Sequence, residues 1–118
     1  MRTDTTTISA SVTVCLLGGV FLAAFGQVLF KVGATGRSTL LDFINPAILG
    51  GLICYGFSTA LWIFSLSKAP LTIVYPFTAL TFVIVYAAGV MFLGEPSSLR
   101  SLSGIALIIF GLFLISGI

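Results

Sequence analysis

Residues 71–96 read LTIVYPFTALTFVIVYAAGVMFLGEP, and this stretch decides the fold. It is apolar almost throughout, and no charged residue stands between Lys68 and Glu95. An uncharged apolar run of about 20 residues is long enough to cross the hydrocarbon core of a bilayer as one helix. The polar exceptions inside the run are two tyrosines and two threonines, with Tyr75-Pro76 near its start. These exceptions indicate a helix that does more than anchor the chain.

The rest of the chain has the same apolar character: 58% of its 118 residues are hydrophobic and 7% are charged. Soluble domains have roughly a quarter of their residues charged, so this chain could not cover a globule in water. No strand-like alternation is present, which favours helices over a barrel. We therefore predict an all-α membrane protein, a single domain over residues 1–118 with four transmembrane helices at about 12–32, 46–67, 71–93 and 100–118. Four short helices enclose little cavity, so we expect this four-helix bundle to function as a dimer.

Several classes of function are excluded by the residues the chain lacks. It has no histidine, and Cys15 and Cys54 stand alone inside apolar runs, so no metal site is predicted. No nucleophile–base pair is visible, which argues against an enzyme, and nothing indicates a cofactor. The net charge of +2 without a basic cluster argues against nucleic acid as a partner.

Helix 12–32 carries a stripe of small and polar residues at a spacing of four. Gly19, Ala23 and Gln27 follow one another in this way, and Lys31 is one step further on. Small residues let a neighbouring helix approach closely in lipid. The same spacing turns Gln27 and Lys31 towards protein. Gln27 either forms a hydrogen bond between helices or contacts a ligand. Lys31 either extends its ammonium to the membrane interface or binds an anionic headgroup.

Four spans place the first and third loops at one membrane face. Five charged residues gather there, namely Lys31, Arg37, Asp42, Glu95 and Arg100. Glu95 is therefore expected either to form an ion pair that fixes helix 71–93 against a neighbour or to contact substrate. Lysine and arginine are nearly balanced between the two faces, so the positive-inside rule leaves the orientation open.

Two further surfaces follow from helical periodicity. At about 100° per residue, Tyr75, Thr78, Phe82 and Tyr86 fall within one narrow sector, which either lines a cavity or serves for anchoring and packing. Gly104 and Gly111 lie one heptad apart on an otherwise aliphatic helix. They are expected to form a dimer contact, or else a close packing surface within one protomer.

The motifs and their order resemble the drug/metabolite transporter superfamily over nearly the whole chain. They are Gly26-Gln27 followed by Lys31, then Tyr75-Pro76, then Gly94-Glu95-Pro96. The chain is most similar in these motifs to the small EamA-like proteins. That group includes the paired flippase subunits that move undecaprenyl-phosphate-linked aminoarabinose across the bacterial inner membrane.

The chain resembles the small multidrug resistance transporters of the same superfamily less closely. That group has a membrane-embedded glutamate in its first helix, eight residues before the lysine, where this chain has Ala23. Its tryptophan in the third helix is also missing, because Thr78 stands near that position. A proton-coupled antiporter needs a titratable acid within the membrane, so drug/proton antiport by that mechanism is not expected.

The resemblance implies a transporter or flippase in the bacterial inner membrane that translocates a lipid-linked anionic substrate. The substrate class is an undecaprenyl-phosphate-type carrier, which can be glycosylated, and the partner is a second copy or a similar small subunit. The residues expected to bind substrate are Lys31, Gln27, Tyr75, Thr78, Glu95, Arg37 and Arg100. Two alternatives stay open: a small exporter of cations or metabolites, and an accessory membrane subunit without transport of its own.

Overall fold

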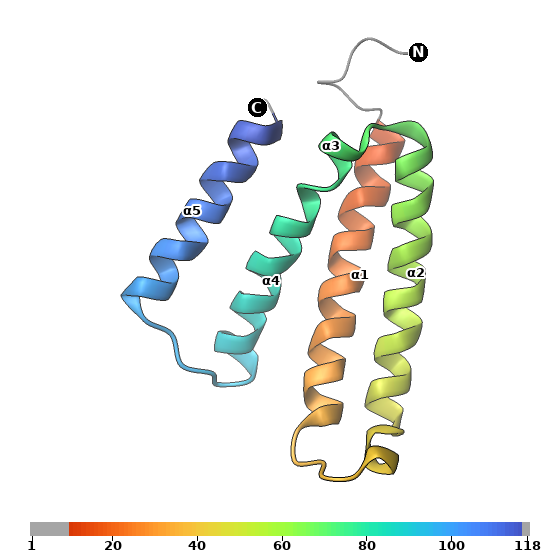
Figure 1. Cartoon of the computed structure of the whole chain (residues 1–118), viewed down its shortest axis with the longest axis vertical. Helices are drawn as coiled ribbons and strands as arrows, with labels where there is room; N and C mark the ends of the chain where they lie inside the picture. Colours follow the sequence, from red (N-terminus) through yellow and green to blue (C-terminus); the bar gives the residue numbers. More distant parts are fainter. Residues whose placement is uncertain (1–9, 117–118) are drawn as a thin grey trace.

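The computed structural model describes residues 10–116, which form helices and contain no strand (Figure 1). The elements are α1 (Ala10–Ala34), the short 3-10 helix η1 (Leu40–Phe43), α2 (Pro46–Lys68), α3 (Leu71–Val74), α4 (Phe77–Phe92) and α5 (Leu99–Ser116). The all-helical prediction is confirmed. The last two residues of the predicted helix 100–118 lie outside the described part of the chain.

Three of the four predicted spans meet the requirements for crossing a membrane by length and composition. They are Ala10–Ala34, Pro46–Lys68 and Leu71–Phe92. The fourth, α5, is apolar over Leu99–Ile115 but shorter. Its 18 residues correspond to a length of about 27 Å at 1.5 Å per residue.

The predicted helix 71–93 is interrupted at Tyr75-Pro76, where α3 ends and α4 begins. Pro76 has no backbone N–H, and its ring excludes the carbonyl four residues earlier, so the α-helical hydrogen bonding cannot continue through it. The turn tightens instead, because Thr78 N–H donates to the Tyr75 carbonyl and Ala79 N–H donates to the Pro76 carbonyl, both at 2.9 Å. The helix predicted over 71–93 is therefore divided at the proline into α3 and α4, although Tyr75 and Pro76 both keep right-handed helical backbone angles.

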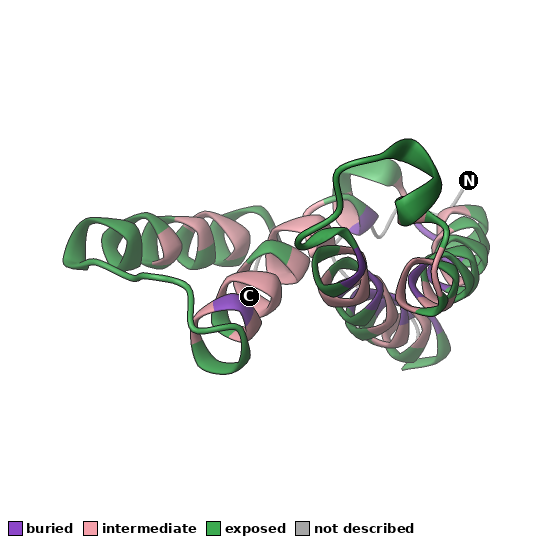
Figure 2. Ribbon diagram, turned by 90° about the horizontal axis from the view of Figure 1, so that it is seen from below, coloured by how far each residue is buried: buried purple, intermediate pink, exposed green. Residues whose placement is uncertain are grey.

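The helices stand in an open row and do not close into a bundle within one chain. In Figure 1, α1 lies between α2 and α4, and α5 lies on the far side of α4. The molecule measures 51 × 34 × 19 Å, and its shortest dimension is less than two helix diameters of about 10–12 Å. Figure 2 shows the buried residues gathered mainly between α1 and α2, whereas none of residues 99–115 in α5 is buried.

A small core closes the end of the molecule at which α1 begins. It consists of Val12 and Leu16 from α1, Ala69 from the turn and Val74 from α3, all at most 9% exposed. Burying these apolar side chains holds α3 against α1. The start of the interrupted helix is thereby fixed, while α4 continues along the face of α1 (Figure 1).

The opposite end of the α1–α2 pair is fastened by Asn45. Its Oδ1 accepts a hydrogen bond from Ile48 N–H and so caps α2, at whose first position Pro46 stands. Its Nδ2 donates to the carbonyls of Gly33 and Asp42, each at 3.0 Å. One side chain therefore joins the end of α1, the loop and the start of α2.

Along their length, α1 and α2 meet at glycines. A Cβ built on Gly26 would lie 2.9 Å from the carbonyl oxygen of Gly51, and a Cβ on Gly51 would lie 2.9 Å from that of Gly26. Nearby, the buried Ser58 hydroxyl donates to the Gly19 carbonyl at 2.7 Å. The small residues in helix 12–32 thus admit a neighbouring helix to backbone contact.

We expect Gly26→Ala to lower the free energy of unfolding by about 1–3 kcal/mol, because the added methyl group must push the Gly51 backbone away. The measurement is unfolding in detergent micelles. Gly56→Ala is the control, because a Cβ there meets no atom within 4 Å. Equal stability of the two variants would contradict the close approach of α1 and α2.

Candidate functional site

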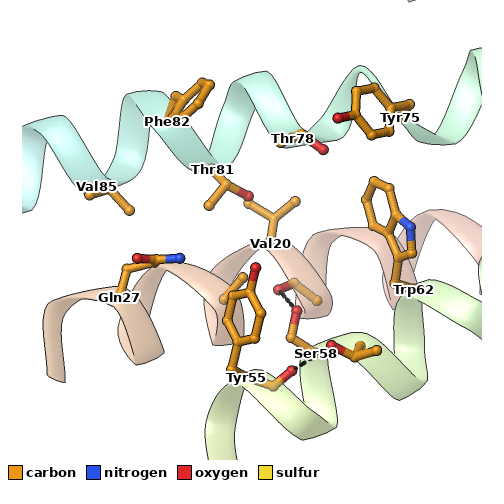
Figure 3. Close-up of a pocket in the computed structure, with 13 residues that line it drawn as sticks. Val20, Gln27, Tyr55, Ser58, Trp62, Tyr75, Thr78, Thr81, Phe82 and Val85 are labelled. Carbon is orange, nitrogen blue, oxygen red and sulfur yellow. Dashed lines mark hydrogen bonds between the residues drawn. The ribbon is translucent and has the colours of Figure 1, made fainter. Parts of the chain in front are cut away.

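A cavity of about 500 Å³ lies between α1, α2 and the α3–α4 segment (Figure 3). Each of the three helical segments contributes polar and apolar side chains to its wall. The residues that line it are Gly19, Val20, Ala23, Gln27, Tyr55, Ser58, Thr59, Trp62, Tyr75, Thr78, Thr81, Phe82 and Val85. The cavity is open at one side, where Tyr75 and Phe82 are 61% and 64% exposed.

Polar groups face the cavity without partners of their own. Figure 3 shows the Tyr55 hydroxyl, the Gln27 amide and the Thr81 hydroxyl directed towards the space between α4 and the α1–α2 pair. Within residues 10–116, none of these groups forms a hydrogen bond to protein. By contrast, the hydroxyls of Ser58 and Thr59 are bonded to the carbonyls of Gly19 and Tyr55. The unpartnered groups are therefore available to a ligand.

Aromatic side chains form one end of the cavity. The rings of Trp62 and Tyr75 meet edge to face, with centroids 6.2 Å apart and planes at 74°. Tyr75 is the last residue before Pro76, so the break between α3 and α4 lies beside this pair. Such aromatic pairs are favourable beyond their buried area and hold each other in place.

An ion pair lies at the end of α1 beyond the cavity. Lys31 Nζ is 3.7 Å from Glu95 Oε2, and the two side chains are 58% and 46% exposed. Together with Val32, Thr35 and Leu93, they line a second, shallower hollow. Lys31 follows Gln27 by one helical turn, so the cation stands just beyond the polar end of the cavity.

The backbone at the end of α4 sets the position of the Glu95 carboxylate. Gly94 adopts φ +70°, which turns the chain back, and Glu95 N–H donates to the Gly89 carbonyl at 3.0 Å. A Cβ on Gly89 would lie 2.9 Å from Glu95 Oε1. The bare Cα of Gly89 therefore makes the space in which the carboxylate lies.

The structure divides the predicted substrate-binding residues into three sets. Gln27, Tyr75 and Thr78 line the cavity, and Lys31 pairs with Glu95 outside it. The remaining two, Arg37 and Arg100, line neither hollow. Arg37 Nε donates to the Gly33 carbonyl at 2.9 Å, and Arg100 is exposed in the first turn of α5. A role for these two arginines stays a prediction.

Comparison with known proteins adds the identity of the family. A model of the EamA-like transporter family matches residues 1–117. The chain belongs to this family. The resemblance predicted from the sequence motifs is thus confirmed. The helices of this EamA-like protein are apolar, as expected for a membrane protein.

Two curated relatives agree with this assignment. The chain is 41% identical over 71 residues to a probable 4-amino-4-deoxy-L-arabinose-phosphoundecaprenol flippase subunit ArnF of Shewanella sediminis, covering 58% of this chain and 49% of that protein. It is 38% identical over 65 residues to a probable 4-amino-4-deoxy-L-arabinose-phosphoundecaprenol flippase subunit ArnE of Yersinia pseudotuberculosis. That match covers 55% of this chain and 57% of the relative. The chain thus spans about half the length of the curated relatives it matches. No solved structure matches it.

The family and its named relatives also settle the broad class of activity. EamA-like proteins are transporters, and both relatives are named as flippase subunits. The protein is therefore a transporter-family membrane protein and not an enzyme.

Sequence periodicity misjudged one member of the cavity and missed others. Tyr86 was placed in the sector of Tyr75 and Thr78, but its hydroxyl bonds Ser97 Oγ at 2.6 Å and the residue does not line the cavity. Thr81, one turn from Thr78, lines it instead. Thr78, Thr81 and Tyr86 all lie in α4, after the break at Pro76, so the break does not separate them. The cavity faces a sector of α4 that extends from Phe82 past Thr78 to Thr81, and Tyr86 lies just beyond the edge of that sector at Phe82. The clustering of Tyr55, Ser58 and Trp62 on one side of helix 46–67 was a usable signal.

We expect the Lys31–Glu95 pair to contribute little to stability, because both side chains are about half exposed. A double-mutant cycle with Lys31→Met and Glu95→Gln should give a coupling free energy below about 1 kcal/mol in unfolding measurements. A coupling free energy of several kcal/mol would contradict this and show that the ion pair stabilises the fold.

Proposed function

We propose that the protein is one subunit of a flippase in the bacterial inner membrane, which translocates a lipid-linked anionic substrate of the undecaprenyl-phosphate type. The observation that carries this proposal is the position of Lys31, a half-exposed cation one turn from a polar cavity. The names of the relatives support the same substrate class. The proposal also treats α5 as the fourth membrane span.

In this proposal, Lys31 receives the phosphate at the membrane face. A half-exposed ion pair is weak, so a phosphate can take the place of Glu95 as the partner of the ammonium. Pairing matters because an unpaired charge inside the bilayer costs several kcal/mol. The headgroup then enters the cavity beyond Gln27, while the polyprenyl tail stays in the lipid outside the helices.

Export of a small cation by proton exchange receives less support from the site. That mechanism needs a carboxylate that can bind either a proton or the cation within the membrane. None of the residues that line the central cavity is acidic in the described structure. Glu95 lies outside it and already has a partner.

We further propose that the open row of helices is completed by a second small subunit, either a copy of this chain or a similar one. The edge helix α5 supports this: a Cβ on Gly104 or Gly111 would meet no atom within 4 Å. Close packing within the protomer therefore does not account for these glycines. Small residues on an open face let a second helix approach in lipid.

We expect Gly104→Leu and Gly111→Leu to lower the dimer fraction, because leucine holds the facing helix away. Native mass spectrometry from mild detergent and cross-linking in membranes measure this fraction. Ala106→Leu is the matched control, since Ala106 lies on the opposite side of α5 from both glycines. If all three variants dimerise like the unaltered chain, the subunit contact does not involve these glycines.

We expect Lys31→Ala to lower the amount of polyprenyl phosphate that stays bound to the purified protein by roughly tenfold, because a charge-assisted contact to phosphate is lost. Native mass spectrometry of the protein in mild detergent measures the retained lipid. Lys68→Ala is the control, because this lysine lies at the other end of α2, with Nζ 5.7 Å from the Phe64 ring centroid.

Two results would count against the flippase proposal. One is that only bulk phospholipid is retained by the unaltered chain. The other is that polyprenyl phosphate is retained equally by both lysine variants, which would remove Lys31 from the binding site. With either result, an accessory role without transport would become the better interpretation.

A further inference from the structure

The cavity between α1, α2 and α4 is polar but carries no charge. Its free polar groups are the Gln27 amide and the hydroxyls of Tyr55, Thr78 and Thr81. The described part of the chain contains six charged residues, and all of them lie outside the cavity: Lys31, Arg37, Asp42, Lys68, Glu95 and Arg100. On the wall that the described residues form, a ligand therefore meets hydrogen-bonding groups and no counter-charge.

Neither of the two carboxylates among the described residues, Asp42 and Glu95, lies where it could pair with a cation in the cavity. Glu95 pairs with Lys31 outside the cavity, and Asp42 is exposed in η1 on the loop between α1 and α2. The connection between α1 and α2, which holds Asp42, and the connection between α4 and α5, which holds Glu95, lie towards the same end of the molecule (Figure 1). If the phosphate of a lipid carrier replaced Glu95 at Lys31, the carboxylate would be released at that end and not inside the cavity.

This lining bears on the chemistry of the headgroup. The headgroup named for the relatives is an aminopentose, 4-amino-4-deoxy-L-arabinose, whose amine is protonated at neutral pH. An ammonium that leaves water for this cavity finds no carboxylate among the residues that line it, and a charge without a partner inside the bilayer is strongly unfavourable. A neutral sugar has no such requirement. Its hydroxyls both donate and accept hydrogen bonds, as do the amide and hydroxyls of the cavity.

The aromatic end of the cavity also suits a neutral sugar. Trp62 and Tyr75 are held against each other there, with ring centroids 6.2 Å apart. Aromatic rings present apolar surface of fixed orientation, against which the carbon–hydrogen face of a sugar ring can pack. The unpartnered polar groups then face the hydroxyls at the rim of the same ring.

From these observations we propose that the lipid carried by this protein bears a neutral, hydroxyl-rich sugar, in contrast to the cationic aminopentose named for its relatives. The proposal rests on the proposed function and specifies its substrate class. It assigns the headgroup to the central cavity and the phosphate to Lys31, so the two parts of the substrate are recognised by separate groups.

A matched pair of ligands tests this on the unaltered chain. One ligand is a polyprenyl phosphate carrying L-arabinose, and the other is a polyprenyl phosphate carrying 4-amino-4-deoxy-L-arabinose. The two differ only in that an ammonium replaces one hydroxyl of the sugar. Bare polyprenyl phosphate is the third ligand. Titrations followed by native mass spectrometry in mild detergent give the three affinities. We expect the neutral glycoside to bind about tenfold or more tightly than the amino glycoside, because the ammonium stays unpaired.

A charge placed in the cavity should change this preference. Gln27→Glu adds a carboxylate to the cavity wall and should shift the ratio of the two affinities towards the amino glycoside by about tenfold. Ser67→Glu adds the same charge at an exposed position outside the cavity and should leave the ratio unchanged. A ratio of two affinities is insensitive to the fraction of each variant that is folded.

The possible results separate the two proposals. Equal or tighter binding of the amino glycoside by the unaltered chain would overturn the neutral headgroup and leave the flippase proposal in place. An unchanged ratio in Gln27→Glu would overturn the assignment of the headgroup to this cavity. If neither glycoside nor bare polyprenyl phosphate binds more tightly than bulk phospholipid, the flippase proposal itself fails, and the neutral headgroup fails with it.

Discussion

The backbone approach of α1 and α2 at Gly26 and Gly51 is the contact on which the rest of the structure depends. In a bilayer, the surrounding lipid is as apolar as the side chains, so helix association relies on close packing and on hydrogen bonds between helices. Close packing is possible because neither Gly26 nor Gly51 has a Cβ, so each approaches the carbonyl oxygen of the other. The hydrogen bond between the helices runs from the Ser58 hydroxyl to the Gly19 carbonyl. The paired helices form one rigid wall, against which the other elements are placed.

The wall of the cavity that faces this helix pair consists of two pieces, α3 and α4. Pro76 prevents a regular helix over residues 71–93, and the apolar core at Val74 holds only the first piece firmly against α1. The second piece, α4, lines the cavity with threonines and a phenylalanine instead of closing onto α1 with small residues. The core therefore closes the segment at Val74, and the polar groups of α1 and α2 stay uncovered beside α4.

Charge and hydrogen-bonding capacity are separated along the molecule. The cation of Lys31 stands at the end of α1, half exposed and weakly paired, whereas the cavity contains only neutral polar groups. A substrate with an anionic phosphate and a hydroxyl-rich headgroup matches this separation. The pairing of Lys31 with Glu95 keeps the cation from facing lipid unpartnered without locking it in place.

The linear sequence determined the helical class, the absence of a central carboxylate and the gathering of charges at one end. These follow from composition and from the parity of the spans, which place Lys31 and Glu95 at the same face before any contact is known. It also carried the motifs by which the family was predicted. These properties depend on residue type and order alone.

Only the tertiary structure decided which polar residues share the cavity. Helical periodicity grouped Tyr86 with Tyr75, but the cavity faces a sector of α4 that is shifted towards Thr81, and the Tyr86 hydroxyl bonds Ser97 outside the wall. The sequence also did not show that Gly26 packs against Gly51, or that Gly89 leaves space for the Glu95 carboxylate. Each contact joins residues that are distant along the chain or separated by a turn. Periodicity describes one straight helix, whereas these relations depend on where two segments meet.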